Sequence, residues 1–230
     1  MGQRKYMSSL KRIVCLANSW KLQERCIAGM DIETGKWIRP VCDLVYPQDG
    51  RIPEETRLIQ GKEPELLQVL EIPLAETGND FGFECENRSV LPGKWNIPGW
   101  VKPQHLIERC ENFPYILHNE LKYVNPSSLQ ALPKEQRYTL QLVRTREILV
   151  QKSSSGKTGW RGTLQTLNGQ TLTDAKITDP TFVEKLETGY NPTGDYLVTV
   201  SLSMPWAPPD WEGEAPSWKL IVGVIEISNG

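Results

Sequence analysis

Residues 138–177 read YTLQLVRTREILVQKSSSGKTGWRGTLQTLNGQTLTDAKI, and this stretch carries the signals of three consecutive β-strands. From Tyr138 to Leu142, apolar and polar side chains alternate with the period of two that is typical of a strand. The phase of this alternation then shifts before the apolar run 148–150. Such a shift predicts one long strand with a β-bulge, and a bulge bends the sheet that contains it.

The second and third strands are predicted from the turns that bound them. Residues 153–157, SSSGK, form a flexible loop that leads to a returning strand over 160–167. The pair Asn168 and Gly169 is a strong hairpin signal, because both central residues of a tight two-residue turn need a positive φ. The third strand then covers residues 171–177.

One helix and two further strands complete this half of the chain. Asp179, followed by proline, is a typical helix start, and a two-turn helix is predicted to end near Gly189. Strands follow over 196–204 and 218–227, separated by a loop rich in proline, tryptophan and acidic residues. Three strands, one helix and two strands is the order of an OB barrel, a five-stranded Greek-key barrel that often binds oligonucleotides.

The front half repeats this order less regularly. A helix is predicted over 103–111, and residues 46–64, rich in proline, glycine and charge, form a long loop. The predicted strands cover residues 12–16, 25–32, 36–41, 66–72 and 81–90. Prolines and serines interrupt the pattern at 125–133. We therefore predict a mainly β chain of two tandem OB-like five-stranded β-barrels with one short helix each, residues 1–130 and 131–230.

The charge balance limits the kinds of partner that the chain can bind. The 230 residues include 26 basic and 28 acidic side chains, for a formal net charge of −2. This balance excludes a protein that binds nucleic acid through bulk positive charge, so any such binding needs a local basic patch.

The cysteines and the apolar runs indicate the compartment. Five cysteines are widely scattered without a Cys-x-x-Cys pair, which is a poor disulfide framework and is typical of a reducing environment. The first apolar run, 13–17, is too short for a signal peptide, and no window approaches the length that spans a bilayer. We expect a cytoplasmic protein without a membrane partner.

Motifs for catalysis or metal binding are incomplete throughout. The run 156–158, GKT, ends like a phosphate-binding loop, but the first glycine of that motif would have to stand at Gln151. The two histidines, His105 and His118, share no close pair with a cysteine, as a zinc site would require. We therefore predict no catalytic residues, no metal site and no cofactor, and we interpret the acidic run 210–214 as solvated surface.

Two runs at opposite ends of the chain carry a family resemblance. The front run comprises RCIAGMD at 25–31 and GKWIRPV at 35–41, and the closing run is WKLIVGVI at 218–225. This sequence resembles the bacterial dual OB-containing domain family, from about Lys11 to Ile227. The resemblance implies two tandem OB folds. It implies no catalytic residues, so it leaves the function open.

Cations beside aromatic residues favour single-stranded DNA or RNA as the ligand. Between Arg144 and Arg161 the sequence holds five basic residues and one acidic residue, and a tryptophan lies among them. Single-strand binders pair cations with phosphates and stack bases on aromatic side chains. The candidate nucleic-acid-binding residues are Arg25, Lys36, Trp37 and Arg39 in front and Arg144, Arg146, Trp160 and Arg161 behind. The alternative for the tryptophans is packing in the barrel core or at a strand end.

Two other functions remain open. The stiff run 205–211, PWAPPDW, presents Trp206 and Trp211 as candidate anchors for a protein partner. A protein-interaction module is therefore one alternative to a non-catalytic nucleic-acid-binding module. The other is an enzyme whose site is assembled between the two barrels, although no local motif supports it.

Overall fold

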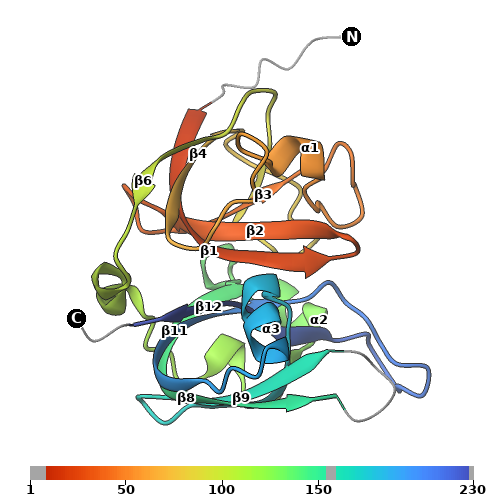
Figure 1. Ribbon diagram of the computed structural model, residues 1–230. Helices are drawn as coiled ribbons and strands as arrows, with labels where there is room; N and C mark the ends of the chain where they lie inside the picture. Colours follow the sequence, from red (N-terminus) through yellow and green to blue (C-terminus); the bar gives the residue numbers. More distant parts are fainter. Residues whose placement is uncertain (1–8, 154–158, 228–230) are drawn as a thin grey trace. The chain divides into compact units, whose positions relative to one another are not determined.

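The computed structural model describes residues 9–153 and 159–227, and it divides into two compact units, Met1–Val101 and Lys102–Gly230. In Figure 1 the first unit runs from red to yellow and the second from green to blue. The predicted division at 130/131 thus lies later than the division in the structure. The predicted loop 153–157 and the run 156–158 fall largely outside the described residues.

The first unit is a small five-stranded barrel with an added edge strand. Its elements are β1 (Ser9–Lys21), β2 (Glu24–Asp31), β3 (Trp37–Val41), α1 (Glu54–Arg57), β4 (Gln68–Leu74), β5 (Asn87–Ser89) and β6 (Asn96–Trp100). β1 pairs with β2 and β4, β2 with β3, and β3 runs parallel to β5. An isolated bridge between Leu74 and Val90 closes the ring. This is the pairing pattern of an OB barrel, as predicted.

Alternating side chains build the core of this barrel. Ile13, Ile27 and Leu70 are fully buried inside it, on three adjacent strands. Gly29, within the front run of the family resemblance, faces β1 so closely that a Cβ there would lie 2.1 Å from the carbonyl oxygen of Val14. The close approach of β1 to β2 therefore requires glycine at this position.

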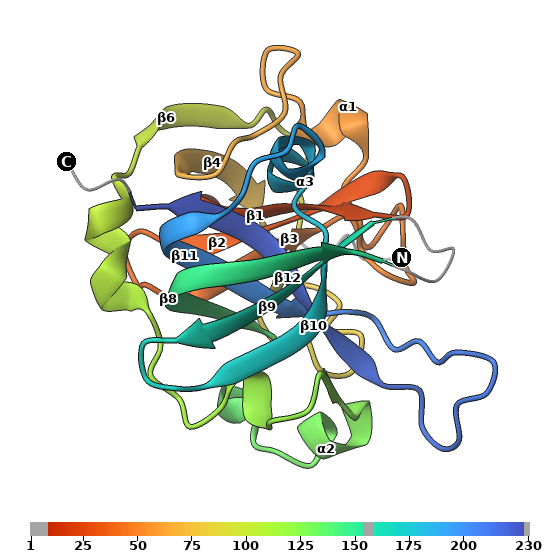
Figure 2. The same ribbon diagram turned by 60° about the horizontal axis from the view of Figure 1, so that its bottom comes forward.

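The second unit is a closed five-stranded barrel (Figure 2). Its strands and main helix are β8 (Leu140–Lys152), β9 (Trp160–Thr166), β10 (Thr171–Ile177), α3 (Pro180–Glu187), β11 (Thr193–Leu202) and β12 (Ser217–Glu226). The ring runs β8-β9-β10-β12-β11 and back to β8, with β10 and β12 parallel. The predicted strand order and the β8 bulge, between Thr145 and Ile148, are both confirmed.

The segment before β8 belongs to the second unit. It contains η1 (Pro103–Arg109), η2 (Ile116–His118), β7 (Tyr123–Val124), α2 (Pro126–Gln130) and η3 (Lys134–Gln136). β7 pairs with β12, and the buried Lys219 donates to the carbonyl oxygens of Ile116 (2.5 Å) and Asn119 (2.6 Å). These contacts explain why the division falls at 101/102. The helix predicted for the front half over 103–111 is thus the 3-10 helix η1 of the second unit, and α1 is the short helix of the first.

The second unit also contains a capped helix and a buried lysine. Asp179 begins α3 as predicted, since its carboxylate accepts from the N–H of Phe182 (3.1 Å). Burial lowers the pKa of Lys219 to about 7. In the parts of the chain that the structure describes, no helix has the length and apolar character needed to cross a membrane.

Candidate nucleic-acid interface

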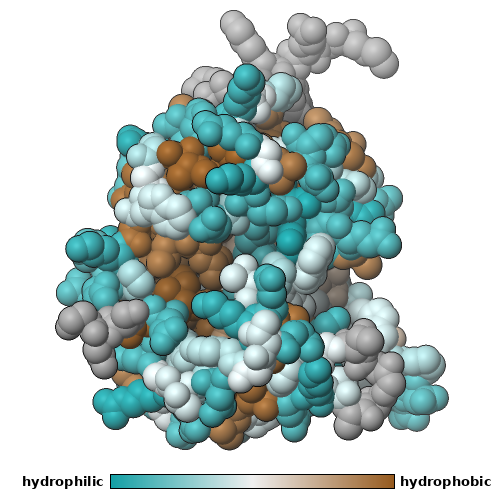
Figure 3. Space-filling model, viewed as in Figure 1, coloured by the Kyte–Doolittle hydropathy of each residue, from teal (hydrophilic) through white to brown (hydrophobic). Residues whose placement is uncertain are grey.

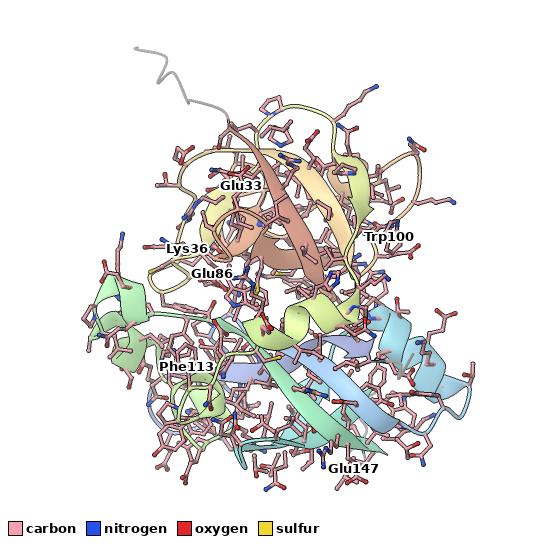
Figure 4. The ribbon with its side chains drawn as sticks, turned by 90° about the vertical axis from the view of Figure 1, so that its left-hand side faces the viewer. Glu33, Lys36, Glu86, Trp100, Phe113 and Glu147 are labelled. Atoms are coloured by element: carbon pink, nitrogen blue, oxygen red, sulfur yellow. The ribbon has the colours of Figure 1, made fainter. Side chains whose placement is uncertain are left out.

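The front candidates do not form one exposed surface. Arg39 is 2% exposed and contacts the carboxylates of Glu84 and Glu86 (3.0 Å to the latter). Its guanidinium is therefore occupied inside the first barrel. Lys36 is exposed immediately before β3, and Trp37, the first residue of that strand, is half-buried (Figure 4 labels Lys36).

Arg25 also lies inside a contact network. It is 8% exposed, and its guanidinium lies 3.6 Å from the ring centroid of Trp20, directly opposite across the β1–β2 hairpin. Its Nε lies 3.8 Å from the Glu63 carboxylate. Trp20 itself is 51% exposed, and the sequence reasoning missed it. The signal that could have found it is its cross-strand position opposite Arg25.

The rear candidates on β8 and β9 differ in what they contact. Arg144 binds Asp195 through two nitrogens, with Nε 2.9 Å from one carboxylate oxygen. The indole N–H of Trp160 donates to Glu187 of α3 (2.6 Å). Lys152 lies 5.3 Å from the same ring. Trp160 thus packs at the strand end, against α3.

Arg161 and a lysine share one carboxylate. Both Arg161 and Lys122 lie 3.2 Å from Oδ2 of Asp174. Lys122 also lies 5.9 Å from the ring centroid of Trp218. Lys176 is exposed and stands on β10 directly between Arg161 of β9 and Leu220 of β12. Two cations therefore share a single carboxylate on this wall of the second barrel, and a third stands opposite Arg161 on the neighbouring strand.

An aromatic cluster adjoins these cations. Trp211 and Trp218 meet edge to face at 5.5 Å between centroids, and Tyr123 meets them at 5.2 and 5.6 Å. The indole N–H of Trp218 donates to the carbonyl oxygen of Trp206 (2.8 Å), and Trp206 is 54% exposed. Such edge-to-face packing is favourable and fixes the rings relative to one another.

These cations and rings form what we call the aromatic–basic surface. It comprises Arg161, Lys176, Lys122, Tyr123, Trp206, Trp211 and Trp218. Sequence reasoning named Arg161, Trp206 and Trp211 but assigned them to two different functions. The parallel pairing of β10 with β12 and the pairing of β7 with β12 bring them together. Lys122, Tyr123 and Lys176 were missed, because nothing in their local sequence marks them.

The loop between β11 and β12 carries part of this surface and is internally bonded. Trp211 donates its indole N–H to the carbonyl oxygen of Glu214 (3.0 Å). The Glu214 carboxylate in turn accepts from the N–H (2.9 Å) and the hydroxyl (2.5 Å) of Ser127 at the start of α2. Glu214, one of the three acidic residues of this loop, therefore helps to fix the conformation of the loop. Figure 2 shows the loop, in blue, extending away from the barrel.

No constellation for metal chemistry is formed by the described residues, where no group of three or more His, Cys, Asp or Glu side chains is placed to hold an ion. The chemistry that the aromatic–basic surface offers is ionic contact and ring stacking.

Comparison with known proteins identifies the family. Residues 11–224 match the family model described as the dual OB-containing domain, so the chain belongs to that family. The match agrees with the two barrels seen in the structure and indicates a binding module. Comparison with curated proteins found no match, and neither did comparison with solved structures.

Proposed function

We propose that this member of the dual OB-containing domain family binds single-stranded nucleic acid on the aromatic–basic surface of its second barrel. OB folds bind oligonucleotides over their second and third strands and over the loops that join strands 1 and 2 and strands 4 and 5. In the second barrel those strands are β9 and β10, and the loop between the fourth and fifth strands is 203–216. Arg161 and Lys176 stand on the two strands, and Trp206 and Trp211 on the loop.

The observation that carries this proposal is the pairing of Arg161 and Lys122 with Asp174, next to Trp218 and with Lys176 directly opposite Arg161. Arg161 and Lys122 outnumber the one carboxylate that they share, and the exposed Lys176 stands opposite Arg161 on the next strand. The 203–216 loop of the same surface also carries Asp210, Glu212 and Glu214, so the positive charge is confined to the strand side of the surface. Phosphates bound there would release counterions, and the exposed Trp206 ring offers a face for a base, worth about 1–3 kcal/mol.

The proposed site revises the candidate residues. Arg161, Trp206 and Trp211 are kept, while Lys122, Lys176, Tyr123 and Trp218 are added. Arg25 and Arg39 are left out because they are buried and hold carboxylates of the first barrel, and Arg144 because it holds Asp195.

The test measures binding of a labelled single-stranded 15-mer to the full chain by fluorescence anisotropy, over a series of salt concentrations. The double variant Lys122→Ala/Lys176→Ala should bind about tenfold more weakly. Its log–log salt dependence should be about 1.4 units shallower, since each single-strand phosphate contact contributes about 0.7.

The matched control is Lys62→Ala/Lys94→Ala, which removes two exposed lysines of the first unit and leaves the same net charge. It should bind like the unaltered chain. Equal affinities for the two double variants, or an affinity that ignores salt, would overturn the proposal.

A protein partner for the 203–216 loop is the second candidate function. The observation that favours it is the loop's fixed shape, in which the N–H of Trp206 donates to the carbonyl oxygen of Pro216 (3.0 Å) while its ring stays exposed. Rigid, exposed tryptophans are common anchors of protein interfaces. Recovery of one partner by the full chain, lost in Trp206→Ala and retained in Lys122→Ala/Lys176→Ala, would support this function over the first.

A further inference from the structure

A hollow lies on the outer wall of the second barrel and uses none of the residues of the aromatic–basic surface. Its volume is about 530 Å³, and it is open to solvent over β8, β9 and the turn that leads to β10. Its lining includes Arg146, Glu147, Leu149, Thr163, Gln165 and Leu167. Figure 3 shows apolar surface over β8 and β9 at the bottom of the view.

The β8 bulge makes this hollow possible. Consecutive residues of a regular strand point to opposite faces, yet Arg146 and Glu147 are both exposed and both line the same hollow. They lie within the bulge between Thr145 and Ile148, and a bulge re-aims side chains in this way. The Thr145 hydroxyl fixes the bulge, since it lies 2.8 Å from the carbonyl oxygen of Glu147 and 2.7 Å from that of Gln165.

The two charged side chains are available to a ligand. Both are exposed, and neither takes part in an ion pair among the described residues, although the pKa of Asp195 is lowered by its hydrogen bond from Arg144 and, in addition, by the nearby positive charge of Arg146. Figure 4 shows Glu147 on the outer side of the second barrel. Leu149 (58% exposed) and Leu167 (47% exposed) add apolar contact area beside them. The hollow thus combines the hydrogen-bond donors of the Arg146 guanidinium, the two acceptor oxygens of the Glu147 carboxylate and the apolar side chains of the two leucines.

The hollow also borders the aromatic–basic surface. Thr163 lines the hollow, and its hydroxyl oxygen accepts from the N–H of Asp174 (3.1 Å), the residue shared by Arg161 and Lys122. A strand bound on the aromatic–basic surface can therefore continue across β9 into the hollow.

We propose that this hollow reads a guanine base of the bound single strand, an inference that rests on the proposed function. Guanine offers two acceptors, O6 and N7, to the Arg146 guanidinium. Its N1–H and N2 amine are two neighbouring donors for the Glu147 carboxylate. The other bases do not offer an acceptor pair and a donor pair together. Leu149 and Leu167, which also line the hollow, offer apolar contact to the faces of the ring.

The experiment compares dT15 oligonucleotides that carry one central base, bound to the full chain and measured by anisotropy. Central guanine should bind at least about fivefold more tightly than central adenine, since a bidentate base contact gives discrimination of this order. Replacing guanine by 7-deazaguanine removes N7, and replacing it by hypoxanthine removes the N2 amine. Each replacement should reduce the preference.

Variants of Arg146 and Glu147 test which side chain contacts the N7 edge of guanine and which contacts its N2 edge. Arg146→Ala should abolish the penalty for 7-deazaguanine, and Glu147→Gln should abolish the penalty for hypoxanthine. The double variant Lys122→Ala/Lys176→Ala is the matched control, because it should weaken every oligonucleotide alike and leave the guanine-to-adenine ratio unchanged. Unaltered thermal unfolding of each variant establishes that the fold is kept.

The outcomes separate this inference from the function on which it rests. Binding of all oligonucleotides with equal affinity for guanine and adenine would overturn the guanine pocket and leave the proposed function standing. A guanine preference that survives both Arg146→Ala and Glu147→Gln would also overturn it. Failure of every oligonucleotide to bind would overturn the proposed function and the pocket together.

Discussion

The two barrels use arginine in opposite ways. In the first barrel Arg39 and Arg57 are 2% and 3% exposed, and each contacts two carboxylates. In the second barrel Arg161 is 31% exposed and shares its single carboxylate with a lysine, and Arg146 is exposed. The buried arginines of the first barrel therefore hold carboxylates in place, as Arg144 also does in the second, whereas Arg161 and Arg146 of the second barrel remain accessible to a ligand.

The largest effect that follows from this comparison is on the stability of the first barrel. Arg39→Ala leaves the buried Glu84 and the Glu86 carboxylate without their cation. It should therefore lower the free energy of unfolding by about 3–5 kcal/mol. Arg161→Ala should lower it by less than about 1 kcal/mol, since partly exposed pairs contribute little.

Chemical denaturation measures both values, and anisotropy measures binding to the same single-stranded 15-mer. Only Arg161→Ala should weaken binding. If both variants lost similar stability, or if Arg39→Ala remained folded and bound the oligonucleotide more weakly, the contrast between the barrels would be wrong.

The second effect concerns pH and is confined to the second unit. Burial lowers the pKa of Lys219 to about 7, from about 10.5 in the unfolded chain. Between these values the unfolded chain binds more protons than the folded chain. The free energy of unfolding should therefore rise with pH, by about 1 kcal/mol per pH unit between pH 7.5 and 8.5.

Urea denaturation at pH 7.0, 7.5, 8.0 and 8.5 measures this slope. Lys219→Met removes the titrating group while keeping a similar side-chain length, so its slope over the same range should be close to zero. A slope shared by the unaltered chain and Lys219→Met would assign the pH dependence to other groups.

The smallest expected effect is on binding affinity and concerns Asp174. It tests whether this carboxylate competes with phosphate for Arg161 and Lys122 or positions these two cations for binding. Asp174→Asn removes the negative charge between Arg161 and Lys122. The residue's positive φ of 52° is one that asparagine also adopts readily. Affinity for the single-stranded 15-mer should rise about threefold to tenfold, with a steeper salt dependence, because two cations are released for phosphates. Stability should change by less than about 1 kcal/mol. Weaker binding by this variant would mean that Asp174 positions the site.

The order of the strands was predictable because short stretches of sequence mark each strand, turn and helix start. Alternation, the Asn168-Gly169 turn and the Asp179 cap each mark an element within a few residues, and the bulge appeared as a shift of phase. The front half was less clear. Residues 81–86 were predicted as part of a strand, but only Asn87–Ser89 forms β5, because tight turns at Asp80 and Phe83 use the preceding backbone groups.

The candidate site was harder to predict because its partners are distant in sequence. Arg39 is buried by Glu84 and Glu86, which lie more than 40 residues away, so its local sequence resembles that of an exposed cation. The aromatic–basic surface is likewise assembled by the β10–β12 and β7–β12 pairings. Local sequence found the charged and aromatic residue types, and only the topology of the barrel groups them.

The closure of the first barrel has a consequence for its motions. Between β4 and β5 the ring is joined by the Leu74–Val90 bridge and by backbone bonds from Ala75 and Leu91, at 2.9 Å each. Because so few backbone hydrogen bonds join β4 to β5, local opening of the barrel should begin between these two strands. The amide hydrogens of Ala75 and Leu91 should thus exchange into heavy water before those in the middle of the β1–β2 ladder, and pulling on the chain should unzip the barrel from here.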